Sequence, residues 1–97
     1  MIVKEHKSID GRVVIAVCDE NLVGKRFEEG RFQLDLGANF YRGEKKTKEE
    51  VLKIFEKADI VNIVGKDSIK LALEADIVSK NRIIKIKNIP HAQALLK

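Results

Sequence analysis

The sequence has few of the residues that disulfide-rich and metal-binding proteins depend on. Its 97 residues include one cysteine, one methionine, one proline, two histidines and no tryptophan. Because Cys18 is alone, no internal disulfide can form, and this favours a reducing cytoplasm. The histidines and Cys18 follow neither HxxxH nor CxxC spacing, so we expect no metal site.

Long apolar runs are also missing. No run approaches the roughly 18 residues of a membrane helix. The charged stretch 4–7 interrupts the start of the chain, unlike the apolar core of a signal peptide. We therefore expect a cytoplasmic protein without a membrane partner.

Motifs for nucleotide binding and catalysis are absent as well. The two Gly-Lys pairs, at Gly24 and Gly65, lack both the earlier glycine and the following serine or threonine of a phosphate-binding P-loop. Neither a GxGxxG pattern nor a GxSxG nucleophile elbow occurs. We therefore expect a non-enzymatic protein that needs no cofactor.

Charge, by contrast, is abundant. Lysine and arginine number 19 against 15 aspartates and glutamates, a net charge of +4, and 35% of the residues are charged. The basic residues are spread along the chain, so the excess permits a polyanionic partner without requiring one. Many lysines and glutamates with few sulfur residues fit a thermophilic source. The length and the 44% hydrophobic content predict one globular domain over residues 1–97.

The clearest structural pattern is a βαβ unit in the C-terminal half. Apolar residues fill 60–64 except for Asn62, as in a strand covered on both faces, and a Gly-Lys pair ends this run. Asp67 or Ser68 is placed to cap a helix over 68–77. A second strand follows at 83–87. We expect the two strands to be parallel, adjacent or nearly so, and joined by a right-handed crossover.

The N-terminal half predicts a β-hairpin followed by a further strand. The expected strands at 1–7 and 12–18 flank an Asp-Gly turn, which is a strong hairpin signal. A compact connection over 19–30 leads to 32–36, where alternating apolar residues predict a half-buried strand. A short strand at 39–41 is expected to return from it.

Thr47 and Glu50 have the spacing of a capping box, which predicts a helix over 48–57. Pro90 is expected to halt any strand, leaving 91–97 as a helical turn or docked tail. Together these elements predict an α/β (α+β-like) fold with a mixed sheet and two principal helices. The expected core residues are Val13, Ile15, Val17, Leu52, Phe55, Ile63, Leu73 and Ile84.

The densest basic cluster follows two adjacent aromatic residues in the stretch 39–48. Positive charge beside a stacking surface is the combination that single-stranded nucleic acid uses, although the same residues also fit a solvated loop. We expect Tyr41 to be the stacking residue, because its hydroxyl favours a partly wet position while Phe40 fills the core. The predicted nucleic-acid contacts are Tyr41, Arg42, Lys45, Lys46 and Lys48, with Lys85 and Lys87 as secondary contacts.

A second candidate site lies at the start of the expected helix 68–77. Gly65, Lys66 and Ser68 could bind an anion there, because free N–H groups and the helix dipole attract phosphate. Asp67 counts against this role, since it adds negative charge at the same place. A plain turn and helix cap is the alternative interpretation.

Taken together, the blocks VVIAVCDENLVGKRFEEG, FYRGE, NIVGKDSI and IPHAQ resemble the archaeal "domain of unknown function 424" family over nearly the whole chain. The resemblance implies a small α/β protein of the archaeal cytoplasm, with no established reaction, ligand or catalytic residue. An alternative interpretation is that Cys18 is a small buried hydrophobic residue and that His91 is a histidine on the surface. Family-block residues of unknown role are Cys18, Lys25, Glu28, Glu29, His91 and Gln93.

Three functions remain open from the sequence. The leading hypothesis is an accessory protein that binds RNA or a ribonucleoprotein, associated with translation, through the basic and aromatic patch. The first alternative is a protein-interaction or regulatory module that uses Glu28, Glu29 and the tail after Pro90. The second alternative is a small phosphate-ligand binder or enzyme built on the turn 65–68, for which a pocket joining His91 to Lys25 or Lys66 would be the sign.

Overall fold

The computed structural model describes residues 1–37 and 39–96. Two α-helices, α1 and α2, and three 3₁₀ turns, η1 to η3, connect the strands within this part of the chain. The elements in chain order are β1 (Ile2–Lys7), β2 (Val13–Cys18), η1 (Glu20–Leu22), β3 (Arg26–Glu29), β4 (Phe32–Asp35), η2 (Asn39–Tyr41), β5 (Glu44–Lys45), α1 (Lys48–Lys57), β6 (Ile60–Val64), α2 (Lys66–Glu74), η3 (Lys80–Arg82), β7 (Ile84–Ile86) and β8 (Ile89–Leu95).

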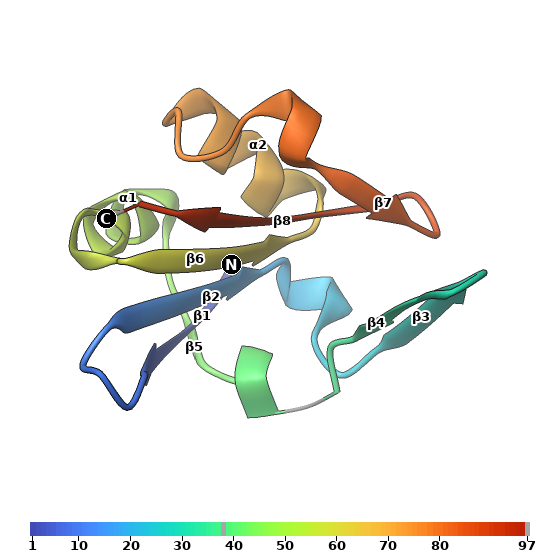
Figure 1. Ribbon diagram of the computed structural model, residues 1–97, viewed down its shortest axis with the longest axis horizontal. Coiled ribbons are helices and arrows are strands. Elements are labelled where there is room, and N and C mark those ends of the chain that lie inside the picture. Colours follow the sequence, from blue (N-terminus) through green and yellow to red (C-terminus); the bar gives the residue numbers. More distant parts are fainter. Residues whose placement is uncertain (38, 97) are drawn as a thin grey trace.

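A six-stranded mixed sheet in the order β5-β1-β2-β6-β8-β7 organises the molecule, and β3 and β4 form a separate hairpin (Figure 1). The parallel pair is β2 and β6, and every other neighbouring pair in the sheet is antiparallel. The predicted α/β fold with a mixed sheet and two helices is confirmed.

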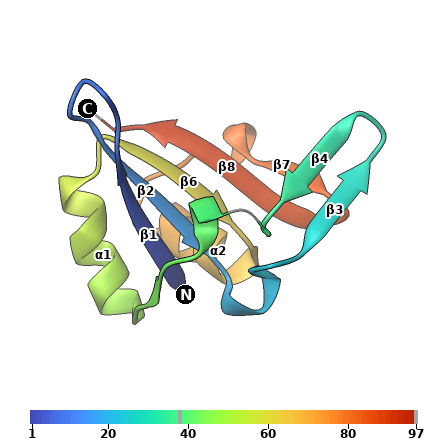
Figure 2. The same ribbon diagram turned by 90° about the horizontal axis from the view of Figure 1, so that it is seen from below.

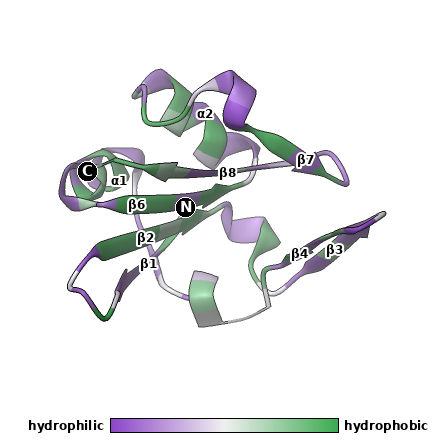
Figure 3. Cartoon of the chain, in the orientation of Figure 1, coloured by the Kyte–Doolittle hydropathy of each residue, from purple (hydrophilic) through white to green (hydrophobic). Residues whose placement is uncertain are grey.

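The two faces of the sheet have separate hydrophobic cores. Both α-helices pack on one face, where Phe55 and Ile69 join Ile15 and Ile63 of the central strands. The opposite face is partly covered by η2 and the β3–β4 hairpin (Figure 2). The central strands are the most hydrophobic elements, whereas the tip of the hairpin is hydrophilic (Figure 3). Because this opposite face is only partly covered, some sheet residues on it are open to solvent.

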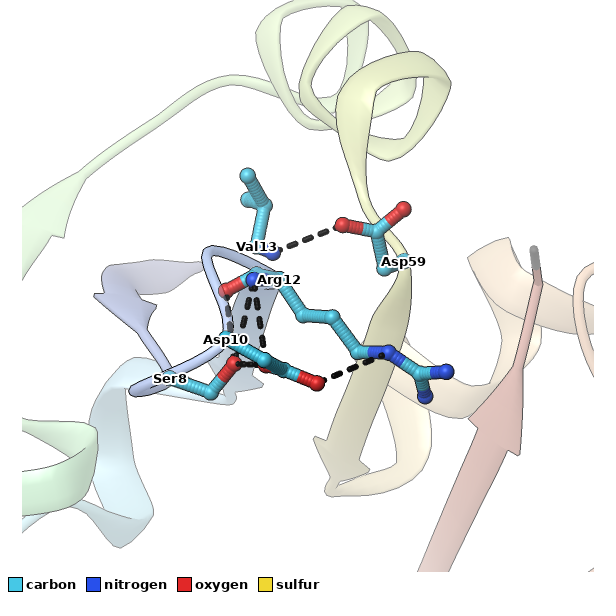
Figure 4. A network of polar contacts seen from close by, with 5 residues as sticks. All are labelled: Ser8, Asp10, Arg12, Val13 and Asp59. Atoms are coloured by element: carbon cyan, nitrogen blue, oxygen red, sulfur yellow. Dashed lines mark hydrogen bonds and ion pairs between the residues drawn. The ribbon is translucent and has the colours of Figure 1, made fainter.

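The predicted N-terminal hairpin is confirmed, and polar contacts hold its turn (Figure 4). The Ser8 hydroxyl donates to the Asp10 carboxylate, and the Arg12 N–H donates to Ser8 Oγ at 3.0 Å. The Ser8 contact, followed by the backbone and side chain of Arg12, lowers the pKa of Asp10. Asp59, directly before β6, accepts the Val13 N–H at 2.7 Å and ties this turn to the parallel strand.

The capping box of α1 is also confirmed, with the predicted bounds 48–57. The Glu50 N–H donates to Thr47 Oγ1 at 3.2 Å, and the Thr47 N–H donates to the Glu50 carboxylate at 3.0 Å. The expected burial of Leu52 is wrong, because this side chain lies at the margin of α1 with 40% of its surface exposed.

The βαβ unit contains a strand that the sequence pattern did not predict. β6 and β7 run in the same direction, as expected, because each pairs antiparallel with β8. They are not neighbours, however, since β8 lies between them. As a result Ile84 belongs to an edge strand, and the prediction that it is core is wrong, with half of its surface exposed.

Pro90 does not halt a strand, and residues 91–95 of the expected helical turn or tail at 91–97 form most of β8, while residue 97 lies outside the described residues. The Pro90 carbonyl accepts the Gly65 N–H at 2.9 Å. The N–H that proline lacks would have pointed to the Gly65 carbonyl, which instead accepts from Ile69 as α2 begins. A proline is therefore tolerated at this point of a central strand because its partner strand is already turning into a helix.

Two further elements differ from expectation. The segment 39–41 forms a 3₁₀ turn, not a returning strand. The compact connection 19–30 contains η1 and also β3, which pairs with β4 through a turn at Gly30. The sequence pattern did not predict β3, because its outward residues are charged and only Phe27 packs inward.

Candidate functional site

The start of α2 is occupied by an internal carboxylate. Asp19, which directly follows β2, accepts the Asp67 N–H at 3.1 Å and the Ser68 N–H at 2.9 Å. The Ser68 hydroxyl donates to the same carboxylate at 2.7 Å, and Ser68 is fully buried. A residue 48 positions away thus caps this helix, in place of the predicted Asp67 or Ser68.

Gly65 makes room for this cap. Its φ is +108°, and a Cβ at this position would lie 2.2 Å from Cγ of Asp19. The Gly65 N–H donates to Pro90. We therefore correct the anion-site prediction: the donors of Gly65 and Ser68 serve Pro90 and Asp19, while the Lys66 side chain is exposed.

The exposed Lys66 borders a groove between α2 and β7. The groove encloses about 370 Å³. Its rim carries Lys66 and Lys70, one helical turn apart on α2, and Lys85 of β7. Its floor is mainly aliphatic. The lining residues, which we call the lysine groove, are Lys66, Ile69, Lys70, Leu73, Ile83, Lys85, Asn88 and Pro90.

No acidic residue lines the lysine groove. Among the described residues, no carboxylate lies within ion-pair distance of Lys66, Lys70 or Lys85. Three uncompensated positive charges around one concave surface raise the local potential for an anion. The groove can therefore bind a polyanion by charge while its floor takes apolar surface.

The turn between β7 and β8 closes one end of the lysine groove. Ile86 pairs with Ile89, so the turn has two central residues, Lys87 and Asn88. Both have left-handed φ values, 52° and 63°, as a type I′ turn requires. Asparagine tolerates this conformation better than lysine does, so the turn places Lys87 at the tip at some conformational cost.

The predicted basic patch at 42–48 lies at the other edge of the sheet. β5 forms one edge and β7 the opposite one, so Lys85 and Lys87 cannot extend this patch. Lys45 pairs with Glu20 and Lys46 with Glu44, each at 3.1 Å. The positive charge that is dense in the sequence is thus partly compensated in the fold.

The expected roles of the two adjacent aromatic residues are reversed. Tyr41 is buried, with 7% of its surface exposed, and burial raises its pKa. Phe40 is half-buried and stacks on the His6 ring with centroids 4.4 Å apart. The prediction that Tyr41 is the partly wet stacking residue is therefore wrong.

Arg42 and Lys48 of the predicted patch are exposed. The Arg42 guanidinium donates to the Gly37 carbonyl at 3.2 Å, which holds the arginine over the loop. Lys48 is the first residue of α1. Nucleic-acid contact by these two residues stays a prediction.

Cys18 and His91 lie in one row across the sheet, since each is in register with Val64. The expectation that Cys18 is a buried hydrophobe is confirmed, and burial, with Asp19 as a second cause, raises its pKa to about 12. His91 is half-buried, and loss of hydration lowers its pKa. His91 and Lys66 line different hollows, so this geometry does not favour a shared pocket.

The remaining family-block residues are spread over the surface. Lys25 and the β3 residues Glu28 and Glu29 are exposed, and Arg26 pairs with Glu28 at 2.8 Å. Gln93 is exposed on the same face of β8 as His91. The structure therefore does not gather these residues into one site.

Sequence reasoning missed Asp19, Lys70 and Asn88. A carboxylate directly after the predicted strand 12–18, with a Gly-Lys turn directly after the predicted strand 60–64, was a usable signal for the Asp19 cap. Lys70 was indicated by its position one helical turn after Lys66. Nothing in the sequence pointed to Asn88, because the β7–β8 turn was not predicted.

Residues 1–37 and 39–96 contain neither a cluster of metal ligands nor a membrane-spanning helix. No group of three or more His, Cys, Asp or Glu side chains is placed to hold a metal ion. Neither α-helix is long and apolar enough to cross a membrane.

Comparison with known proteins identifies the family. The model of the family described as "Protein of unknown function (DUF424)" matches residues 6–96, and the chain belongs to this family. No curated protein matches the chain. A solved structure described as an uncharacterized conserved protein from Methanopyrus kandleri is similar, with a TM-score of 0.77 and 20% identity over 99% of this chain and 92% of that one. At this identity the likeness shows the shared fold.

Proposed function

We propose that this protein binds RNA, free or within a ribonucleoprotein, and that the lysine groove is the contact surface. The observation that carries the proposal is the convergence of Lys66, Lys70 and Lys85 on one groove without a carboxylate partner among the described residues. The proposal keeps the archaeal, cytoplasmic and translation-associated setting expected from the sequence.

Phosphate neutralisation supplies most of the affinity in such a contact. Each lysine that meets a phosphate releases a condensed counterion, so binding weakens steeply as salt rises. Lys66 and Lys70 stand on one wall and Lys85 on the other, which lets a single backbone strand pass between them. Lys87 is exposed in the same turn as Asn88, which lines the groove.

The aliphatic floor shapes the expected specificity. Ile69, Leu73 and Ile83 can contact ribose carbons or a base face, but they offer no hydrogen bonds to base edges. The groove should therefore discriminate weakly among sequences. It should also prefer single-stranded RNA, whose bases are free to turn onto an apolar surface.

Fluorescence anisotropy with a labelled single-stranded oligouridylate of about a dozen nucleotides tests the proposal. Replacing Lys66, Lys70 and Lys85 together by glutamine should reduce the slope of log K against log salt by about 2–3. The matched control replaces Arg42, Lys45 and Lys46 by glutamine, which removes the same charge at the other edge.

The control triple variant should change the salt slope by less than about one. Equal slopes for the two triple variants would show that net charge alone drives binding and would overturn the groove assignment. Absence of binding by the wild type at moderate salt would overturn the function itself. Circular dichroism and thermal melting of both variants check that the fold is intact.

A further inference from the structure

The C-terminal half of β8 has a free edge. β8 extends to Leu95, whereas its pairing with β7 ends at His91. On the side away from β6, residues 92–95 have no strand partner in the part of the chain that the structure describes. Residues 92–95 of β8 therefore form a short unpaired edge of the sheet beyond the end of β7, which we call the step.

The hydrogen-bond register identifies the groups at this step. The Pro90 carbonyl accepts from Gly65, and the Leu96 N–H donates to the carbonyl that precedes β6. Successive residues of a strand direct their N–H and C=O groups to opposite sides. The even-numbered residues of β8 therefore face β6, and Gln93 and Leu95 direct their backbone donors and acceptors into the open step.

A hollow lies beside this step. It encloses about 420 Å³ between residues 93–95 and the loop 77–82, so the step is not filled by the loop. Arg82 lines the loop side, and no carboxylate among the described residues lies within ion-pair distance of its guanidinium. Leu95 at the step is 66% exposed.

We propose that this step binds an extended acidic peptide as an added antiparallel strand. The peptide backbone exchanges hydrogen bonds with Gln93 and Leu95, as in other cases of strand addition, and a peptide carboxylate pairs with Arg82. The inference is independent of RNA binding, because the step and the lysine groove have no lining residue in common.

Charge distinguishes this occupant from a second copy of the chain. A two-fold pairing of β8 with β8 would centre on Ala94 and would bring a second Arg82 to the same step. Like charges brought together at an interface cost affinity. An acidic segment instead brings negative charge to Arg82, so the same geometry increases its affinity for the step.

The probe is a fluorescent pentapeptide of alternating valine and threonine that ends in aspartate. It is titrated to about 1 mM against the full chain. In the free protein the amides of Gln93 and Leu95 should exchange with solvent much faster than those of Ala92 and Ala94. With peptide, the Gln93 and Leu95 amides should become protected.

Three variants separate the contributions. Gln93→Pro removes an N–H without a partner in the fold, so it should abolish peptide binding and leave the melting temperature unchanged. Ala94→Pro removes an N–H that faces β6, so it should lower the melting temperature. Arg82→Gln should weaken the aspartate peptide several-fold and leave an asparagine-ended peptide unaffected.

Three outcomes would overturn the proposal. The first is absence of peptide binding, and the second is binding that Gln93→Pro leaves unchanged. The third is protection of the Gln93 and Leu95 amides without peptide, together with a dimer mass in sedimentation equilibrium. That last result would assign the step to a second copy of the chain.

Discussion

The two basic regions of this molecule, the segment 42–50 and the lysine groove, differ in the sequence separation of the residues that contact one another there. In the segment 42–50, Lys46 pairs with Glu44 and the helix cap joins Thr47 to Glu50, all within a few residues. Around the lysine groove, the cap of α2 comes from Asp19, and the lysines come from two elements. In the first region the helix cap and one of the two ion pairs are local, and only the pair of Lys45 with Glu20 is long-range. The second region is assembled by the sheet.

The comparison shows why charge density in a sequence is a poor guide to free charge in a fold. The segment 42–48 has the densest run of basic residues, yet two of them have carboxylate partners. The groove lysines come from two elements, Lys66 and Lys70 from α2 and Lys85 from β7, yet they converge on one surface. An anion responds to the surface potential, which the tertiary structure determines.

The largest expected effect comes from removing the long-range cap. Asp19→Ala should cost about 2–4 kcal/mol, because buried donors of Asp67 and Ser68 lose a charged acceptor. Urea denaturation measures this change. Sulfate should restabilise the variant more than the wild type, since the freed N–H groups can then bind an external anion.

A wild-type denaturation midpoint for Asp19→Ala would contradict this prediction and would mean that the long-range cap does not stabilise the fold. Equal effects of sulfate on both proteins would mean that the vacated position does not bind anions. Asp19→Asn is the matched control, because it keeps an acceptor oxygen and should lose less stability than the alanine variant.

Removing the local cap should have a smaller effect. Thr47→Ala deletes an exposed acceptor at the start of α1 and should cost roughly 0.5–2 kcal/mol. The same denaturation experiment allows a direct comparison with Asp19→Ala. A larger loss for Thr47→Ala than for Asp19→Ala would reverse the proposed contrast between local and long-range organisation.

A pH dependence is expected on the β7 side of the sheet. Burial lowers the pKa of His91 in the folded state, so the unfolded chain binds a proton more readily. Stability is therefore fully present above the unfolded pKa, near 6.5, and falls as pH decreases through the folded value. Thermal melting from pH 7 to pH 5 should show a smaller decrease for His91→Gln than for the wild type.

The smallest effect is expected for the exposed ion pair of Lys45 with Glu20. A double-mutant cycle with glutamine at both positions should give a coupling energy of about 0.2–1 kcal/mol, screened by salt. This pair is relevant because it reduces the free charge of the segment 42–48. A coupling that does not change with salt would contradict its assignment as a solvated surface pair.

Local signals made much of the fold predictable. The Asp-Gly turn gave the N-terminal hairpin, and the Thr47–Glu50 spacing gave the bounds of α1. The apolar run 60–64 gave β6 without error. In each case the residues that carry the signal are also the residues that make the contacts, so distance along the chain introduces no ambiguity.

The site was less predictable, because its parts come from separate segments. Lys66 was recognised at a helix start, and Lys85 was assigned to a patch at the wrong edge of the sheet. Their convergence depends on the position of β8 between β6 and β7. β8 was not predicted, because Pro90 was expected to halt any strand. Asp19 was overlooked for the same reason, since its partners lie 48 and 49 residues away.

The sequence by itself determined the family, the single α/β domain, the first hairpin and the self-capped helix α1. Only the tertiary structure decided the strand order, the cap of α2, the burial of Tyr41 and the choice of lysines that remain free. The physical reason is the distance along the chain between the residues that interact. Turns and capping boxes are completed within a few residues, whereas sheet order and surface charge depend on which distant segments pack together.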